Sequence, residues 1–471
     1  MYDPNLLSLV PPLLAIMLAI ATRQVIISLS IGIWVGYCIL ESVNPVVGLS
    51  LGIDGIVNVF DDAGDTRVLI FTLIIGGLIA TIEKVGGVRG FIYLLESKKW
   101  VDGSTKAQWL AYFTGMVIFI ESNITLLIAG SISRPLFDRY KIAREKLAYI
   151  IDSTSAPICI MIPLNAWGAI IISLTASADI SNPLQVFIAA IPFNLYPIIV
   201  IIFSALVIWR NIDLGPMRTA QTRTEEGDLL WPGATPMVDP SILQSNESGG
   251  AEDKARFMLL PIFSMVIAMP ISLYITGNGV ISDGSGSISV LWSVLIAVLV
   301  LWIIVLSHKR SKVDELMNTF LKGAGGLLPV AMILLFALAL GDVSNTLGTG
   351  IYVASLVEDS IPLGLLLPIL FLVSSVIAFS IGSSWGTFAI MIPLAIQLSV
   401  LLDSDSALFL AAVLSGSVFG DHASPISDTT VVASMASATD HIDHVRTQLP
   451  YALIAAAIAA IGFLLIGFAV L

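Results

Sequence analysis

The sequence predicts an all-α polytopic membrane protein built as two inverted repeats of five spans each, with one re-entrant hairpin and one broken helix per repeat. Three observations predict this fold class. Of the 471 residues, 56% are hydrophobic and only 12% are charged, whereas a soluble domain carries roughly a quarter charged residues. Apolar runs with the length of a membrane span recur along the chain. The two halves also carry the same kinds of element in the same order.

A membrane-spanning helix needs about 20 mostly apolar residues. In the first repeat, residues 1–210, this criterion predicts spans at Leu6–Ala21, Val25–Leu40, Leu69–Ile82, Leu147–Leu174 (interrupted) and Pro183–Trp209. In the second repeat, residues 257–471, it predicts spans at Phe257–Ile275, Val290–Leu306, Leu327–Leu340, Ala407–Ala436 (interrupted) and Tyr451–Leu471. The polar residues 211–256 are expected to form a solvated cytoplasmic linker loop between the repeats.

Two further apolar stretches carry small polar residues at their centres. Residues 109–131 contain Glu121–Thr125, and residues 363–402 contain Ser380–Thr387. Two apolar arms that meet at a polar tip are typical of a re-entrant hairpin, and irregular backbone at that depth is tolerated where it lines a wet cavity. The alternative is a pair of ordinary spans joined by a polar kink.

The placement of charge predicts the orientation. If each half crosses five times and the hairpins do not cross, one side of the membrane receives all but Arg67 of the 22 lysines and arginines. Basic loops stay in the cytoplasm, so both termini are expected outside. An odd number of crossings makes the second repeat start on the opposite side from the first. Such inverted repeats are typical of secondary transporters.

Both broken spans place carboxylates at membrane depth. The first contains Asp152–Pro157, and the second contains Asp421–Pro425 with Asp428 shortly after it. Proline breaks a helix, broken helices free carbonyl groups that can coordinate a cation, and an intramembrane carboxylate marks an ion path or a proton relay. The two breaks and the two hairpin tips are therefore predicted to meet in a cation site near the midplane.

The candidate ligands are short side chains with oxygen atoms, because hard cations such as Na⁺ prefer oxygen. We expect Na⁺ at Asp421, Asn123 and Ser383. The wider ion- or proton-binding set comprises Asp421, Asp428, Asp152, Ser424, Thr430, Ser122, Asn123, Thr125, Ser153, Ser155, Ser383, Ser384 and Thr387. Asp421 and Asp428 are the favoured carriers, because a carboxylate that holds either Na⁺ or a proton exchanges the two by competition. Alternatively, the aspartates only cap helices and the hydroxyls only pack them together.

His422 and Glu121 are candidates for a proton relay or a pH sensor, since histidine titrates near neutral pH. A neutral hydrogen-bonded histidine, or a glutamate in a wet vestibule, is the alternative. His441 and His444 are interpreted as part of a solvated connection, with a pH-sensing patch as the alternative. The sequence contains no nucleotide, haem, nucleophile or closed metal-ligand pattern. We therefore expect no enzyme activity, no cofactor besides the transported Na⁺ and H⁺, and no nucleic acid partner.

Several motifs resemble the NhaC-type Na⁺/H⁺ antiporter family. They are Gly420–Thr430 followed by Asp440–Tyr451, Gly382–Thr387 with Met391–Pro393, and Arg144–Pro157, and the likeness runs from about Ile75 to the C-terminus. The resemblance implies the wider ion-transporter superfamily. It also implies a homodimer with a scaffold part and a moving part made of hairpins and broken helices. The expected location is the plasma membrane, the bacterial inner membrane, surrounded by lipid.

The sequence departs from this family at two places. Position 423 is Ala where relatives often carry Cys, and the tip Glu121–Asn123 stands where some relatives place paired aspartates. The second departure leaves the ion count and the substrate open. The favoured function is exchange of cytoplasmic Na⁺ for external H⁺ by alternating access. The alternative is Na⁺-coupled transport or exchange of a small organic anion or amino acid, which the lack of Lys and Arg at the tips and breaks disfavours. A channel and a membrane enzyme are the other classes considered.

Overall fold

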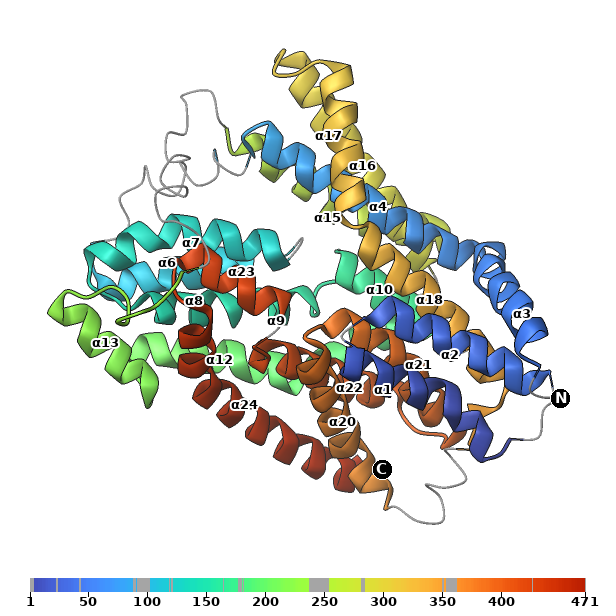
Figure 1. Ribbon diagram of the computed structural model, residues 1–471. Helices are drawn as coiled ribbons and strands as arrows, with labels where there is room; N and C mark the ends of the chain where they lie inside the picture. Colours follow the sequence, from blue (N-terminus) through green and yellow to red (C-terminus); the bar gives the residue numbers. More distant parts are fainter. Residues whose placement is uncertain are drawn as a thin grey trace.

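The computed structural model describes residues 4–22, 24–41, 44–87, 90, 102–117, 119, 122–163, 165–176, 180, 182–236, 254–280, 284–349, 351–352, 362–425 and 427–470. Their regular structure is helical, and no strand occurs among these residues. The fold class is therefore all-α, as predicted. Figure 1 shows the helices packed at many different angles, with α15, α16 and α17 projecting from the rest of the molecule.

The elements follow each other closely along the chain. The first half contains η1 (Leu6–Leu9), α1 (Val10–Thr22), α2 (Val25–Leu40), α3 (Pro45–Asn58), η2 (Val59–Asp61), α4 (Ala63–Lys84), α6 (Ser104–Val117), α7 (Ser122–Arg139), α8 (Arg144–Asp152), α9 (Ala156–Cys159), α10 (Ala166–Ala176), α11 (Pro183–Ala190), η3 (Ile191–Phe193) and α12 (Leu195–Arg210). The second half contains α13 (Pro216–Glu226), α15 (Arg256–Thr276), α16 (Gly286–Ser307), α17 (Val313–Gly326), α18 (Leu328–Thr346), η5 (Leu363–Leu365), α20 (Leu366–Ile381), α21 (Ser384–Leu401), α22 (Ser406–Ala423), α23 (Asp428–Ser437) and α24 (His441–Val470).

Seven helices in the described part of the chain are long and apolar enough to cross a membrane, or up to nine if each of two bent pairs counts as one span. The seven are Ala63–Lys84, Arg256–Thr276, Gly286–Ser307, Leu363–Ile381, Ser384–Leu401, Ser406–Ala423 and His441–Val470. This supports a multi-pass membrane protein. The predicted total of ten spans, the orientation of the termini and the inverted relation of the two halves stay predictions.

The two stretches predicted as hairpins each form a pair of helices in contact, α6 with α7 and α20 with α21. Gly382 ends α20 in the left-handed conformation, with φ of +73°, which glycine adopts without steric cost. The side chain of Ser383 then caps the start of α21. Because η5 together with α20, and α21 by itself, are each long enough to cross a membrane, two ordinary spans remain an alternative for the second stretch.

The break between α22 and α23 connects two groups of helices. α22 packs against α20 and α21, whereas α23 packs against α7 and α8 of the first half. Figure 1 shows α23 lying among α6, α7 and α8, away from α20 and α21. α24 contacts elements of both groups, and α12 contacts α22 and α24. Ser424, Pro425 and Ser427 therefore lie where the two halves of the sequence meet.

Two glycines in α22 allow α20 to approach closely. A Cβ atom added at Gly416 would lie 2.2 Å from the carbonyl oxygen of Phe371, and one at Gly420 would lie 2.3 Å from that of Ser375. Their spacing of four residues is that of the small-residue motif which brings membrane helices together. Gly420 also precedes Asp421, so this contact fixes the turn of α22 that carries the carboxylate.

We expect Gly420→Ala to destabilise the protein by about 1–3 kcal/mol, because the backbone of α20 would have to move away from the added methyl group. Thermal unfolding in detergent measures this effect. Gly325→Ala is the matched control, since a Cβ atom there meets nothing within 4 Å. Equal melting temperatures for the two variants would contradict the close-packing account.

The prediction of a solvated loop at 211–256 is wrong for its helical part. Pro216–Glu226 forms α13, which packs against α8 and α24. Arg223 of α13 forms a bidentate ion pair with Glu145, with Nη1–Oε1 at 2.9 Å and Nη2–Oε2 at 3.1 Å. Further along the linker, the backbone N–H of Thr235 donates to Asp440 at 2.9 Å. The linker is therefore attached to the starts of α8 and α24.

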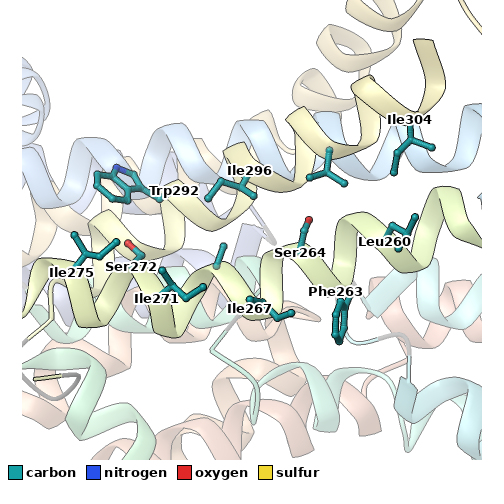
Figure 2. A pocket seen from close by; sticks show the side chains of 12 residues that line it. Leu260, Phe263, Ser264, Ile267, Ile271, Ser272, Ile275, Trp292, Ile296 and Ile304 are labelled. Atoms are coloured by element: carbon teal, nitrogen blue, oxygen red, sulfur yellow. The ribbon is translucent and has the colours of Figure 1, made fainter. Parts of the chain in front are cut away.

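An apolar groove of about 590 Å³ lies between α15 and α16. Figure 2 shows isoleucines, Phe263 and Trp292 lining it, with Ser264 and Ser272 between them. Phe263 is 64% exposed and Ile271 is 53% exposed, as expected for a surface that faces hydrocarbon rather than water. None of the aspartates predicted to carry ions lines this groove, so it is separate from the candidate ion site.

Candidate functional site

Asp421 lies in the last turn of α22, buried with 1% of its surface exposed. The hydroxyl of Ser384 donates to its Oδ2 at 2.8 Å, and the hydroxyl of Ser427 donates to its Oδ1 at 2.5 Å. Ser384 comes from the first turn of α21, and Ser427 comes from the break after α22. Each carboxylate oxygen thus has a neutral hydroxyl partner, and the two partners come from different elements.

The local sequence explains this geometry. Pro425 prevents α22 from continuing, and Ser424 is already extended, with φ −79° and ψ 131°. The hydroxyl of Ser424 donates to the carbonyl of Phe379 at 2.7 Å and ties the end of α22 to α20. Ser427 is the N-cap of α23 and accepts a hydrogen bond from the N–H of Thr430. The same serine therefore starts the next helix and binds Asp421.

Asp152 ends α8 and is equally buried, at 1% exposure. Its Oδ2 accepts a hydrogen bond from Nε2 of Gln448 at 2.8 Å. Nε2 of His422 lies 3.7 Å from the same oxygen, and Nε2 of His444 lies 3.9 Å from it. The structure therefore brings Asp152 of the first half close to His422 of the second, and their role in ion or proton binding stays a prediction.

His441 and His444 were interpreted as part of a solvated connection, and this interpretation is wrong. α24 already begins at His441, and His444 is fully buried. His444 is hydrogen-bonded through Nε2 to Oε1 of Gln448 at 2.8 Å and through Nδ1 to Ser434 at 2.9 Å. His441 Nε2 lies 2.6 Å from the carbonyl oxygen of Pro425. The first turn of α24 thus turns its histidines toward the break.

Sequence reasoning missed three polar residues of this cluster: Gln448, Tyr196 and Ser434. The hydroxyl of Tyr196 lies 2.6 Å from Nδ1 of His422, and both residues are buried. Gln448 follows His444 by one helical turn, on the same face of α24. The sequence offered one signal for Gln448. His444 and Gln448 are two polar residues four positions apart, directly before a long apolar run. Nothing in the sequence around Tyr196 indicated its contact.

Several predicted ligands support helix ends. Ser383 accepts a hydrogen bond from the N–H of Gly386, and the hydroxyl of Thr387 donates to the carbonyl of Ser383 at 3.1 Å. Together with Ser424, these hydroxyls hold the backbone around Asp421. In the first break, the hydroxyl of Ser155 lies 3.5 Å from the carbonyl oxygen of Asp152.

The remaining predicted residues are buried near the starts of helices or in the first break. They are Ser122 and Thr125 in α7, Ser153 in the turn after α8, and Thr430 in α23. α7 contacts both α8 and α23. The second helix of the α6–α7 pair therefore lies beside both broken spans. Glu121 and the side chains of Asn123 and Asp428 lie outside the described residues. The sodium site expected at Asp421, Asn123 and Ser383 therefore stays a prediction.

The two positive charges at the start of α8 have acidic partners. Arg144 pairs with Asp138 at 2.8 Å and Lys146 pairs with Asp213 at 2.9 Å, while Glu145 between them pairs with Arg223 at 2.9 Å. Lys146 precedes Asp152 by six residues, about 9 Å along the helix. In the described part of the chain, no group of three or more His, Cys, Asp or Glu side chains has the geometry to hold a metal ion.

Buried carboxylates in membrane helices mark ion paths or proton relays, and broken helices are typical of the binding sites of membrane transporters. Residues 169–468 match the model of the Na⁺/H⁺ antiporter family, and the chain belongs to that family. This confirms the resemblance to the NhaC-type antiporters. The family and the structural neighbours are transporters, and neither indicates enzyme activity.

Three similar proteins illustrate this relationship. An uncharacterised protein of Haemophilus influenzae is 33% identical over 501 residues, which cover 99% of this chain and 92% of that protein. A malate-2H⁺/Na⁺-lactate antiporter of Bacillus subtilis is 38% identical over 97 residues, 21% of each chain. The crystal structure of the YdaH transporter of Alcanivorax borkumensis has a TM-score of 0.58 at 14% identity, covering 90% of this chain and 89% of that chain. The last likeness shows the fold alone.

Proposed function

We propose that this protein exchanges cytoplasmic Na⁺ for external H⁺, with Asp421 as the carrier group. The observation that supports this most is the environment of Asp421, a buried carboxylate with one hydroxyl partner on each oxygen. Burying a charge is costly, and uptake of a proton or pairing with a cation lowers that cost. Proton and Na⁺ therefore compete for the same group.

The serine partners suit both states. A hydroxyl group has one donor hydrogen and two acceptor lone pairs, and its hydrogen rotates. When Na⁺ binds, Ser384 and Ser427 turn lone pairs toward the ion and complete an oxygen site with the carboxylate. When a proton binds, the neutral acid donates to one hydroxyl and accepts from the other. Neither state requires Lys or Arg.

The position of Asp421 in the fold supports the proposal of alternating access. The carboxylate lies at the end of α22, just before the chain passes from the α20–α21 group to the α7–α8 group. Movement of one group against the other exposes the carboxylate to one side and then to the other, which is the general mode of transporters with broken helices. A homodimer, with lipid around it, remains our expectation for the assembly.

A second candidate is Na⁺-coupled exchange of a small organic solute. The match to the malate-2H⁺/Na⁺-lactate antiporter favours it, because that relative moves an organic anion with the same ions. An organic anion would need a cationic group in the site. The cations nearest along α8, Arg144 and Lys146, are already paired with Asp138 and Asp213, which favours the cation exchanger.

Reconstituted vesicles loaded with a pH-sensitive dye test the proposal. A Na⁺ gradient alone is expected to drive proton movement in the opposite direction, without any organic solute. Empty vesicles with a proton ionophore give the background. If Na⁺ moves no protons and enters only when malate, lactate or an amino acid is present, the second candidate is correct and the first is wrong.

A further inference from the structure

Gln448 joins the two broken helices through a third helix. Its Nε2 donates one hydrogen to Oδ2 of Asp152 at 2.8 Å and the other to the carbonyl of His422 at 2.7 Å. Its Oε1 accepts from Nε2 of His444 at 2.8 Å. Both amide hydrogens and the carbonyl oxygen are thus used, and Gln448 is 1% exposed. α24 therefore holds the end of α8 against the end of α22.

We propose that Gln448 is a positioning residue that couples the occupancy of Asp152 to the position of Asp421, and this inference rests on the proposed function. His422, whose carbonyl accepts the hydrogen bond, directly follows Asp421 in the last turn of α22. A hydrogen bond to an ionised carboxylate is about twice as strong as one between neutral groups. An ionised Asp152 therefore holds the amide of Gln448 more firmly than a neutral Asp152 does. Through the same amide, the last turn of α22 is held more firmly as well.

The surroundings of Gln448 explain why the side chain is an amide. Both groups that face Nε2 are acceptors, so this atom must carry the two hydrogens, and Oε1 must face the N–H of His444. His444 is itself held by Ser434 of α23 at 2.9 Å. A carboxylate at position 448 would face Asp152 without a hydrogen to donate, and an asparagine is one methylene group shorter. Only a glutamine combines two donors with one acceptor at this reach.

The arrangement also links four helices at one residue. The acceptors lie on α8 and α22, the amide lies on α24, and His444 extends the network to α23. α22 and α23 are the two sides of the break, so Gln448 contacts one side directly and the other through His444. A residue in this position transmits a change at Asp152 to the whole break, whereas a simple packing residue does not.

The test uses the full-length purified protein with ²²Na⁺ binding and vesicle exchange as separate measurements. The variants are Gln448→Ala, which removes all three hydrogen bonds, and Gln448→Glu, which keeps the shape and removes the donors. Gln397→Ala is the matched control, because Gln397 is a buried glutamine of α21 outside the hydrogen bonds of Gln448 and Asp152. Gel filtration and thermal unfolding establish that each variant is folded.

We expect Gln448→Ala to raise the Na⁺ concentration for half-maximal exchange and for binding by about tenfold, the equivalent of 1.4 kcal/mol. The maximal rate is expected to stay within about twofold. In Gln448→Glu, two carboxyl groups share one site and hold a proton to higher pH. Because the position of Asp421 is proposed to depend on the charge of Asp152, the pH profile of exchange is expected to shift by about one unit to the alkaline side. Gln397→Ala is expected to retain the wild-type values.

Three outcomes overturn the inference. Wild-type Na⁺ affinity in folded Gln448→Ala shows that the amide does not position the site. An equal fall in maximal rate for both variants, without a pH shift, shows a purely structural role. A wild-type protein that binds no Na⁺ refutes the transport proposal together with this one. If the wild type binds Na⁺ but moves no protons, the exchange proposal alone fails, and the altered Na⁺ binding of Gln448→Ala still supports the positioning role.

Discussion

Asp421→Asn is expected to lower Na⁺-driven proton exchange by at least ~100-fold in reconstituted vesicles. The substitution keeps the size of the side chain and removes its negative charge. Hydrogen bonds to a charged group contribute about 1.5–3 kcal/mol each, and the carboxylate has two hydroxyl partners. The amide also has no exchangeable acid proton. Both the binding of Na⁺ and the uptake of the proton are therefore expected to be lost together.

The matched control for this variant is Asp405→Asn. Asp405 caps the start of the same helix and accepts a hydrogen bond from the N–H of Ala407 at 2.9 Å. Its loss is expected to cost about 1 kcal/mol of stability, as for other N-caps, with exchange kept within about twofold. If Asp421→Asn is correctly folded and exchanges at the wild-type rate, Asp421 is not the carrier group.

Arg223→Ala is expected to destabilise the protein by about 3–5 kcal/mol. Glu145 is 0% exposed, and its ion pair with Arg223 links α8 to α13. Removing one partner of a buried pair leaves the other charge without compensation, which costs this much in other proteins. The loss of the stacking of Arg223 on Trp231, at 4.8 Å from the ring centre, adds to the effect. Thermal unfolding in detergent and the yield of folded protein measure it.

Two comparisons separate this explanation from a general loss of charge. Lys106→Ala removes a pair with Asp102 whose side chains are 55% and 73% exposed, and such exposed pairs contribute about 0–1 kcal/mol. The double variant Arg223→Met with Glu145→Leu leaves no buried charge and is expected to regain most of the lost stability. A double variant as unstable as Arg223→Ala would show that the charge of Glu145 is not the cause.

Much of the fold class and part of the candidate site could be predicted from the sequence. Apolar runs give helices of membrane length because their side chains must avoid water. Pro425 and the serines around it predict the end of α22 and the start of α23, since both depend on residues that are neighbours in sequence. Asp152 and Asp421 were recognised because buried carboxylates are rare in apolar helices. Gln448 bonds Asp152 and the carbonyl of His422, the residue after Asp421, so the two breaks are connected through α24.

The rest depends on contacts between distant residues. α13 was predicted as loop because Pro216–Glu226 is polar, yet the buried charge of Glu145 binds it to α8. Tyr196 and Gln448 became part of the site only because α12 and α24 pack beside the two breaks. Ser383 and Thr387 are predicted as ion ligands from their oxygen atoms, and in the structure both hydroxyls are hydrogen-bonded to the backbone at the start of α21; their role as ligands stays a prediction. The sequence alone does not show which partner a hydroxyl group bonds, because that depends on the distances to the surrounding backbone atoms.

The most direct test of the central claim is the number of protons released when Na⁺ binds. Calorimetric titration of the purified protein in two buffers with different heats of ionisation gives this number. Competition at Asp421 predicts a release close to one proton per Na⁺ at a pH where the site is protonated, with a Na⁺ affinity that falls as the pH is lowered. Tight Na⁺ binding that releases no proton and does not depend on pH would contradict the account.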